Sequence, residues 1–298
     1  MRYGLYMALK EWGAFWLLGL VWGSSFLWIK IAVAYMAPVA VAAFRLLFGL
    51  LGLLVVVAAL RQPFPKTARA LRPYLVTGAL QAGVPFALIA WGETKIDSGL
   101  AAILNGTMPL FTIVIAHLWL HDERITPPRL LGLAIGFAGV VVLGSRDIGP
   151  GGLHATAWGQ IALLAATVSY ALAATFSRRH LRGEPPLVQA TLVVLTGDAL
   201  LWCTVAATER PLHISSAPIL WIALAWLGLL GSCLAYLLYF YLINAWGATR
   251  ASLVTYVFPV VGLILGIVFL GERVDWPLAA GSLLVIAGIF VVGRARAG

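Results

Sequence analysis

The hydrophobic positions of the chain form ten long, nearly continuous runs separated by short polar or turn-forming segments. Each run is about twice as long as a barrel strand, and none alternates with the period of two that such a strand requires. A helix needs about 20 apolar residues to cross a bilayer. The pattern therefore predicts an all-α polytopic membrane protein with ten transmembrane helices, over residues 12–34, 37–60, 73–95, 98–120, 128–145, 156–178, 187–208, 218–243, 249–270 and 275–293.

The composition excludes most other classes of protein. Of 298 residues, 62% are apolar and only 10% are charged, whereas a soluble domain carries about 25% charged residues. Ten spans leave room for tails and tight loops but not for a water-soluble catalytic or nucleotide-binding domain. The sequence contains neither the phosphate-binding motif of an ATP-driven pump nor the paired histidines of an intramembrane metalloprotease. We expect no enzyme activity, no cofactor, no metal site and no nucleic-acid partner; a channel is a less favoured alternative.

The basic residues predict the orientation, because lysine and arginine gather in cytoplasmic loops. Ten helices place both termini on one side. The segments on that side carry 14 basic residues and those on the other side carry four, which favours cytoplasmic termini. We expect the protein to lie in a cell membrane, such as a bacterial inner membrane. The 14 are Arg2, Lys10, Arg61, Lys66, Arg69, Arg72, Arg124, Arg129, Arg178, Arg179, Arg182, Arg250, Arg294 and Arg296, and the four are Lys95, Arg146, Arg210 and Arg273.

The two halves of the sequence resemble each other. Residues 123–144 align with residues 272–293 at an offset of 149, with eight of 22 positions identical. At offsets of 146 to 150, Trp12-Gly13 aligns with Trp158-Gly159, Lys30 with Arg178, and Pro109 with Pro259. We divide the chain into repeats at residues 1–147 and 148–298. Since each repeat has five helices, the second is inverted, and inverted repeats place a substrate site near the midplane between the halves.

Several motifs are similar to those of one family. They are WGSSF (Trp22 to Phe26), the Pro38, Phe44, Arg45 pattern, and an ending in each half with a Gly-Glu or Asp-Glu turn followed by G…AGV or G…AGI. Together they resemble the EamA-type ten-helix members of the drug/metabolite transporter superfamily. That resemblance implies export of amino acids, other metabolites or drugs. It also implies a central cavity lined by the first, third, fourth, sixth, eighth and ninth helices, with the fifth and tenth peripheral.

Three charged residues lie within the predicted spans and are candidates for mechanism, because intramembrane charges are costly. Arg45 and Asp198 lie at similar depth in the second and seventh helices. We hypothesise that they pair or that each faces a water-filled cavity, with Asp198 either a proton-coupling carboxylate or a structural group. Lys30 lies nearer the outer interface, where it either snorkels or holds a substrate carboxylate. Glu93 and Lys95 are expected to be solvated or to form an external gate.

Aromatic and neutral polar residues supply the candidates for the cavity wall. A tyrosine in mid-membrane needs a partner for its hydroxyl, which favours protein or cavity over lipid. An asparagine side chain both donates and accepts hydrogen bonds. The candidates, each of which could instead pack between helices, are Trp22, Ser25, Gln81, Asn105, Tyr170, Tyr236, Tyr239 and Tyr256.

Pro109 and Pro259 are repeat equivalents inside the fourth and ninth helices, so they are candidate hinges or static kinks. An aromatic cavity with few charges suits amphipathic molecules, and aromatic or hydrophobic amino acids are our first choice of substrate. A broader drug or metabolite exporter is the alternative. The sequence is compatible with export or import, with proton coupling or uniport, and with a monomer.

Overall fold

The computed structural model describes residues 2–65, 67–119, 125–145, 148, 149, 152, 153, 155–246 and 252–294. Five residues of the charge count, Lys66, Arg124, Arg146, Arg250 and Arg296, lie outside the described part of the chain, as does position 147 at the expected repeat boundary.

The first half contains five membrane helices, which we number in chain order. Helix 1 is α1 (Arg2–Ala32) and helix 2 is α2 (Pro38–Leu60). Helix 3 consists of α3 (Ala68–Gly78), the π-helical segment η1 (Ala79–Gly83) and α4 (Val84–Glu93). Helix 4 consists of α5 (Ser98–Gly106) and α6 (Met108–Trp119), and helix 5 is α7 (Pro127–Gly144).

The second half repeats this order after two short antiparallel strands, β1 (Ile148–Gly149) and β2 (Gly152–Leu153). Helix 6 is α8 (Ala155–His180) and helix 7 is α9 (Pro186–Thr208). Helix 8 consists of α10 (Pro218–Ala225), the π-helical segment η3 (Trp226–Leu234) and α11 (Ala235–Trp246). Helix 9 consists of the 3-10 segment η4 (Ser252–Tyr256) and α13 (Val257–Leu270), and helix 10 is α14 (Trp276–Arg294).

The predicted all-α class with ten membrane helices is confirmed. Eight helices are long and apolar enough to cross a bilayer, and the apolar segments Val254–Leu270 and Trp276–Val292 are shorter. Large apolar side chains are exposed along the outer faces of the bundle, among them Val55, Leu118 and Leu283. A water-soluble surface of this size would not carry so many, whereas lipid accommodates them.

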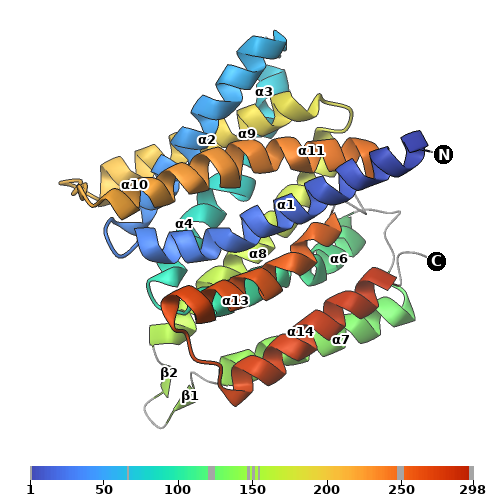
Figure 1. Ribbon diagram of the computed structural model, residues 1–298, viewed down its shortest axis with the longest axis vertical. Coiled ribbons are helices and arrows are strands. Elements are labelled where there is room, and N and C mark those ends of the chain that lie inside the picture. The colour runs from blue at the N-terminus through green and yellow to red at the C-terminus, as the bar shows by residue number, and fades with distance from the viewer. Residues whose placement is uncertain are drawn as a thin grey trace.

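Helices 5 and 10 form a pair at the edge of the bundle. In Figure 1, α7 and α14 lie side by side and apart from the helices around α1 and α8, and α1 begins on the same side of the molecule on which α14 ends. The pair packs backbone against backbone: a Cβ atom at Gly132 would lie 2.8 Å from the Gly288 carbonyl oxygen, and one at Gly139 would lie 2.8 Å from that of Gly281. Small residues are what permits such close approach of membrane helices.

Equivalent contacts recur in the two halves, as an inverted repeat requires. Helix 2 packs on helix 8 where a Cβ at Gly49 would come within 2.6 Å of Ser232 Cβ. Helix 7 packs on helix 3 where a Cβ at Gly197 would come within 2.6 Å of Ala82 Cβ. Gly49 and Gly197 are repeat equivalents, and so are Ser232 and Ala82. The duplicated, inverted halves therefore share their packing as well as their sequence.

The two π-helical segments also occupy equivalent places, η1 in helix 3 and η3 in helix 8. Pro85 follows η1 and cannot donate the backbone hydrogen bond of an α-helix. Helix 8 has no proline there, yet its Ser232 hydroxyl donates to the Leu227 carbonyl five residues back. Segments of this kind are rare and concentrate at functional sites, and here both border the central cavity.

Helices 4 and 9 change geometry just before the candidate hinge prolines. Helix 4 is interrupted at Thr107, ahead of Pro109, and helix 9 passes from 3-10 to α geometry after Tyr256, ahead of Pro259. The two helices cross closely here, since a Cβ at Gly106 would lie 2.7 Å from Pro259 Cγ. Proline fits the first turn of a helix because no intrahelical acceptor is available there. The hinge role of the two prolines stays a prediction.

Candidate functional site

A cavity of about 430 Å³ lies between the two halves. Residues of helices 1, 3, 4, 6, 8 and 9 form its wall, which agrees with the set that the family resemblance implied. Two arginines come from outside that set, Arg45 from helix 2 and Arg129 from the first turn of helix 5. The cavity is thus shared between the repeats.

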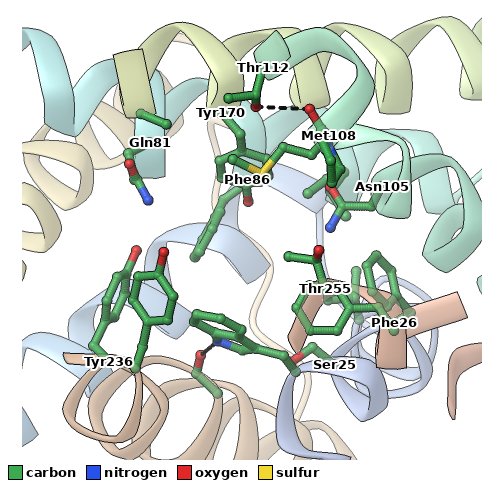
Figure 2. Close-up of a pocket in the computed structure, with 18 of the residues that line it drawn as sticks. Ser25, Phe26, Gln81, Phe86, Asn105, Met108, Thr112, Tyr170, Tyr236 and Thr255 are labelled. Carbon is green, nitrogen blue, oxygen red and sulfur yellow. Dashed lines mark hydrogen bonds between the residues drawn. The ribbon is translucent and has the colours of Figure 1, made fainter. Parts of the chain in front are cut away.

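Seven of the eight cavity candidates line this space. Figure 2 shows Gln81 and Asn105 above the cavity and Tyr236 below it, with the ring of Phe86 between them. The seven are Trp22, Ser25, Gln81, Asn105, Tyr170, Tyr236 and Tyr239. Their location makes them available to a ligand; their contact with substrate stays a prediction.

Tyr256 lies elsewhere. Its hydroxyl donates to the Ile289 carbonyl of helix 10 at 3.2 Å. The adjacent Thr255 lines the cavity instead, because neighbouring residues of a 3-10 helix project about 120° apart. In the structure Tyr256 therefore helps to attach helix 10 to helix 9, and the expected cavity role falls to its neighbour.

Trp22 is the centre of an aromatic cluster on the cavity wall. Its ring centroid lies 5.4 Å from that of Tyr239, 5.7 Å from that of Phe258 and 6.3 Å from that of Tyr236. Its indole nitrogen donates to the Gly231 carbonyl at 3.0 Å, so the ring is held in place. The cluster joins helices 1, 8 and 9 and offers ring faces and edges to an apolar ligand.

The neutral polar groups on the wall differ in how they are satisfied. Ser25 donates to the Val21 carbonyl of its own helix at 3.2 Å, and Thr112 donates to the Met108 carbonyl at 2.9 Å, as Figure 2 shows. The Gln81 side chain lies against the Tyr236 hydroxyl across the cavity. The amide oxygen of Asn105 is buried and has no partner among the described residues. Asn105 therefore retains unused hydrogen-bonding capacity.

Arg45 faces the cavity, as the second hypothesis required of both charges. It is 8% exposed, and its guanidinium carbon lies 4.2 Å from the centroid of the Phe86 ring. Its Nε donates to the Ser232 hydroxyl at a long 3.4 Å. Phe86 and Ser232 belong to helices 3 and 8, the repeat-related pair that flanks the cavity.

Asp198 does not pair with Arg45, and it is not among the residues that line the cavity. Both side chains are described, and no ion pair joins them. Asp198 is buried beside Trp202, one turn further along helix 7, and one of its carboxylate oxygens has no partner in the described part of the chain. The physical reason is register: the repeat equivalent of Arg45 is Val193, so Asp198 lies five residues further along and on another face of its helix.

Lys30 is not among the residues that line the cavity, and its snorkelling to the interface stays a prediction. Its ammonium group donates to the carbonyls of Glu93 and Ile96, both at 2.7 Å. The Glu93 carbonyl belongs to the last residue of helix 3 and the Ile96 carbonyl to the turn that follows it. At such a helix end a cation satisfies unpaired acceptors and complements the helix dipole. The expectation that Glu93 is solvated is wrong, since its side chain is fully buried.

Glu272 links helices 4 and 9 at the same end of the molecule. Its carboxylate accepts from the Ser98 amide at 2.6 Å, the Ser98 hydroxyl at 2.7 Å and the Gly99 amide at 2.9 Å, and so caps the N-terminus of α5. Gly271, at φ +66°, provides the left-handed turn that brings Glu272 back toward helix 4.

The cavity therefore has two unlike ends. At the end near Lys30 and Glu272, the last lining residues are Ile29 and Ile89. Ile29 directly precedes Lys30, and Ile89 lies one turn before Glu93. Toward the other side the cavity extends to Arg129 and to Arg178 in the last turn of α8, and Arg178 is itself exposed. One end is closed by side chain to backbone hydrogen bonds, and the other reaches the protein surface.

Sequence reasoning missed five wall residues that matter for the chemistry of the cavity: Phe86, Met108, Thr255, Arg129 and Arg178. Arg178 could have been found, because it aligns with Lys30 in the other repeat. Phe86 and Met108 carry no such signal, since apolar residues fill every face of a membrane helix.

A cavity with an aromatic wall, which lies between two inverted five-helix halves and reaches the surface at one end, is typical of a membrane transporter. The sequence profile of the EamA-like transporter family matches residues 11–145 and 157–294. The chain belongs to this family, within the drug/metabolite transporter superfamily. It is a multi-pass membrane protein and a secondary transporter, not an enzyme.

Relatives of full length support this assignment. The chain is 28% identical to an uncharacterized transporter of Archaeoglobus fulgidus, with 97% of this chain and 100% of the relative covered. It is 28% identical to the uncharacterized inner membrane transporter YedA of Escherichia coli K12, with 95% and 90% covered. A probable amino-acid metabolite efflux pump of Salmonella typhimurium is 27% identical, with 91% and 90% covered.

A solved crystal structure shows the same fold. It superposes with a TM-score of 0.67 over 95% of this chain and 96% of that chain, at 20% sequence identity. At that identity the likeness concerns the fold alone.

Proposed function

We propose that the protein exports small amphipathic metabolites, with aromatic or hydrophobic amino acids as first substrates, by alternating access at the central cavity. The observation that carries this proposal is the asymmetry of the cavity, closed beside Lys30 and Glu272 and extending to the surface at Arg129 and Arg178. Inverted repeats let such a site face either side in turn. The Salmonella relative, named for amino-acid metabolite efflux, supports the substrate class.

The proposed orientation places both termini, and the end of the cavity that reaches the surface, in the cytoplasm. It rests on the 14 to 4 distribution of basic residues. Arg129 and Arg178 belong to the richer side, so the described conformation faces inward. We place the boundary between the repeats at residues 147 and 148. An inward-facing cavity with an aromatic wall suits the loading of a metabolite for export.

The direct test is uptake of a panel of amino acids into liposomes that contain the purified protein, with and without a pH gradient. We expect saturable transport of aromatic or large apolar amino acids and little transport of small or acidic ones. A rate that follows the pH gradient in the wild type but not in Asp198→Asn would support proton coupling through Asp198. If no amino acid is transported, the substrate proposal is wrong and a broader drug or metabolite exporter takes its place.

A further inference from the structure

Arg45 is a buried cation that forms no ion pair with another described residue. The buried carboxylate of Glu93 is close enough to interact with it electrostatically but does not contact it. Arg45 is 8% exposed, and a charged group at this depth is costly unless it has a function or a counter-ion. Its one hydrogen bond to another described residue is the long contact of Nε with Ser232. The two terminal nitrogens of the guanidinium therefore have no acceptor within the described part of the chain.

The surroundings of Arg45 fix the orientation of the guanidinium. The guanidinium carbon lies over the Phe86 ring, 4.2 Å from its centroid, and Nε donates to the Ser232 hydroxyl. Hydrogen bonds of a guanidinium lie in its plane, and the terminal nitrogens form the fork that matches a carboxylate. Neither contact uses a hydrogen bond of the terminal nitrogens, so the fork is available to a ligand.

Gly231 keeps space open at one of these nitrogens. A Cβ atom at this position would lie 3.6 Å from Arg45 Nη2 and 3.2 Å from Ser25 Oγ. Gly231 and Ser25 both line the cavity, and the Trp22 indole is bonded to the Gly231 carbonyl. The fork of Arg45 therefore lies beside the aromatic cluster, where a molecule with a polar head and an apolar body would contact both.

The charge of the described cavity wall has one sign. The wall contains three arginines, Arg45, Arg129 and Arg178, and none of the described lining residues is an aspartate or a glutamate. Arg129 and Arg178 also interact with other groups, so the preference for an anion depends on Arg45, which in a partly desolvated cavity attracts an anion and disfavours a cation.

We propose that Arg45 binds the carboxylate of the transported molecule, whose apolar part packs against Trp22, Tyr236 and Tyr239. This inference rests on the proposed function and narrows it: the substrate is an amphipathic carboxylate, whether an amino acid or an organic acid without an amino group. The same geometry excludes amphipathic amines that lack a carboxylate, which are a large group of drugs.

The test is equilibrium binding of four probes that share a phenyl group to the purified protein. The probes are phenylalanine, 3-phenylpropionate, phenylalaninamide and 2-phenylethylamine. We expect the two carboxylates to bind at least about tenfold more tightly than the amide and the amine. Loss of a hydrogen bond to a charged group weakens binding by about this factor. Arg45→Gln should abolish that preference, while Arg45→Lys should keep part of it.

Two further variants protect the test against misfolding. Arg179→Gln makes the same change at an exposed arginine that does not line the cavity, and it should keep the preference. Gly231→Ala keeps every charge and places a methyl group beside the Arg45 fork, so it should weaken binding of the carboxylates more than that of the amine. The Gly231→Ala variant therefore tests the site even if the Arg45→Gln protein does not fold.

The possible binding results distinguish failure of this inference from failure of the proposed function. If phenylalanine and its amide bind equally well, or if Arg45→Gln is folded and keeps the preference, the inference is overturned. If 3-phenylpropionate binds through Arg45 and phenylalanine does not, the inference stands and the amino-acid proposal fails. If only the amine and the amide bind, the inference fails and small-molecule transport stands. Absence of binding by all four probes overturns both.

Discussion

Lys30→Met is expected to open the cavity to the side that carries Lys30. The ammonium group ties helix 1 to the last carbonyl of helix 3 and to a carbonyl of the turn after it, both at 2.7 Å. A hydrogen bond to a charged group contributes about 1.5–3 kcal/mol, so losing these bonds should shift the equilibrium between the inward and outward states by about tenfold or more. Methionine keeps the length of the side chain and removes the charge.

The measurement is labelling of a single cysteine in the cavity, Ser25→Cys, by a membrane-impermeant maleimide applied from the Lys30 side. The native Cys203 and Cys233 are replaced first. Lys95→Met is the matched control, because the Lys95 ammonium lies 4.8 Å from the Trp91 ring and joins no two helices by a hydrogen bond among the described residues. Equal labelling of the Lys30→Met and Lys95→Met proteins would show that Lys30 does not close this end.

Trp22→Ala should lower the apparent affinity for aromatic substrates at least about tenfold, since full burial of an aromatic ring contributes about 1.5–3 kcal/mol and ring pairs about 0.5–1.5 kcal/mol more. The ring lies at the centre of the cavity cluster and bonds to the Gly231 carbonyl. Trp22→Phe should recover most of the affinity, because it restores the ring without the indole N–H.

Trp28→Ala is the control for this prediction. Trp28 belongs to the same helix, is also half-buried and pairs with Trp226 at 5.5 Å, but it does not line the cavity. Concentration dependence of transport in liposomes separates the two variants. We expect a raised KM for Trp22→Ala and an unchanged KM for Trp28→Ala. An equal effect of both would mean that aromatic packing in helix 1, rather than ligand contact, explains the loss.

The architecture was predictable because it depends on the hydropathy of the chain and on the repeat of its two halves, and both can be read from the sequence. Continuous apolar runs marked all ten helices, and the alignment of Pro109 with Pro259 identified helices 4 and 9 as two of those whose geometry changes in the structure. The repeat also predicted packing, since glycines aligned in sequence make equivalent contacts. The π-helical segments were not predictable: an extra residue in a turn alters no hydropathy, and helix 8 forms its segment without a proline.

Two of the failures at the site, at Asp198 and Tyr256, have a common physical cause. Depth in the membrane can be read from position along a helix, but facing direction changes by about 100° with each residue of an α-helix and by about 120° with each residue of a 3-10 helix. Asp198 matches Arg45 in depth yet lies on another face, and Tyr256 faces helix 10 while Thr255 faces the cavity. Glu93 at a helix end suggested exposure to water, whereas the tertiary fold buries it.

The central claim is that one cavity between the two halves serves both sides of the membrane in turn. Counterflow tests it most directly: liposomes containing the protein are loaded with unlabelled phenylalanine, or with the carboxylate that binds best, and diluted into a trace of the labelled compound. The account predicts a transient accumulation of label above equilibrium that saturates with concentration. Influx that rises linearly with concentration, without overshoot, would contradict a carrier and indicate a channel.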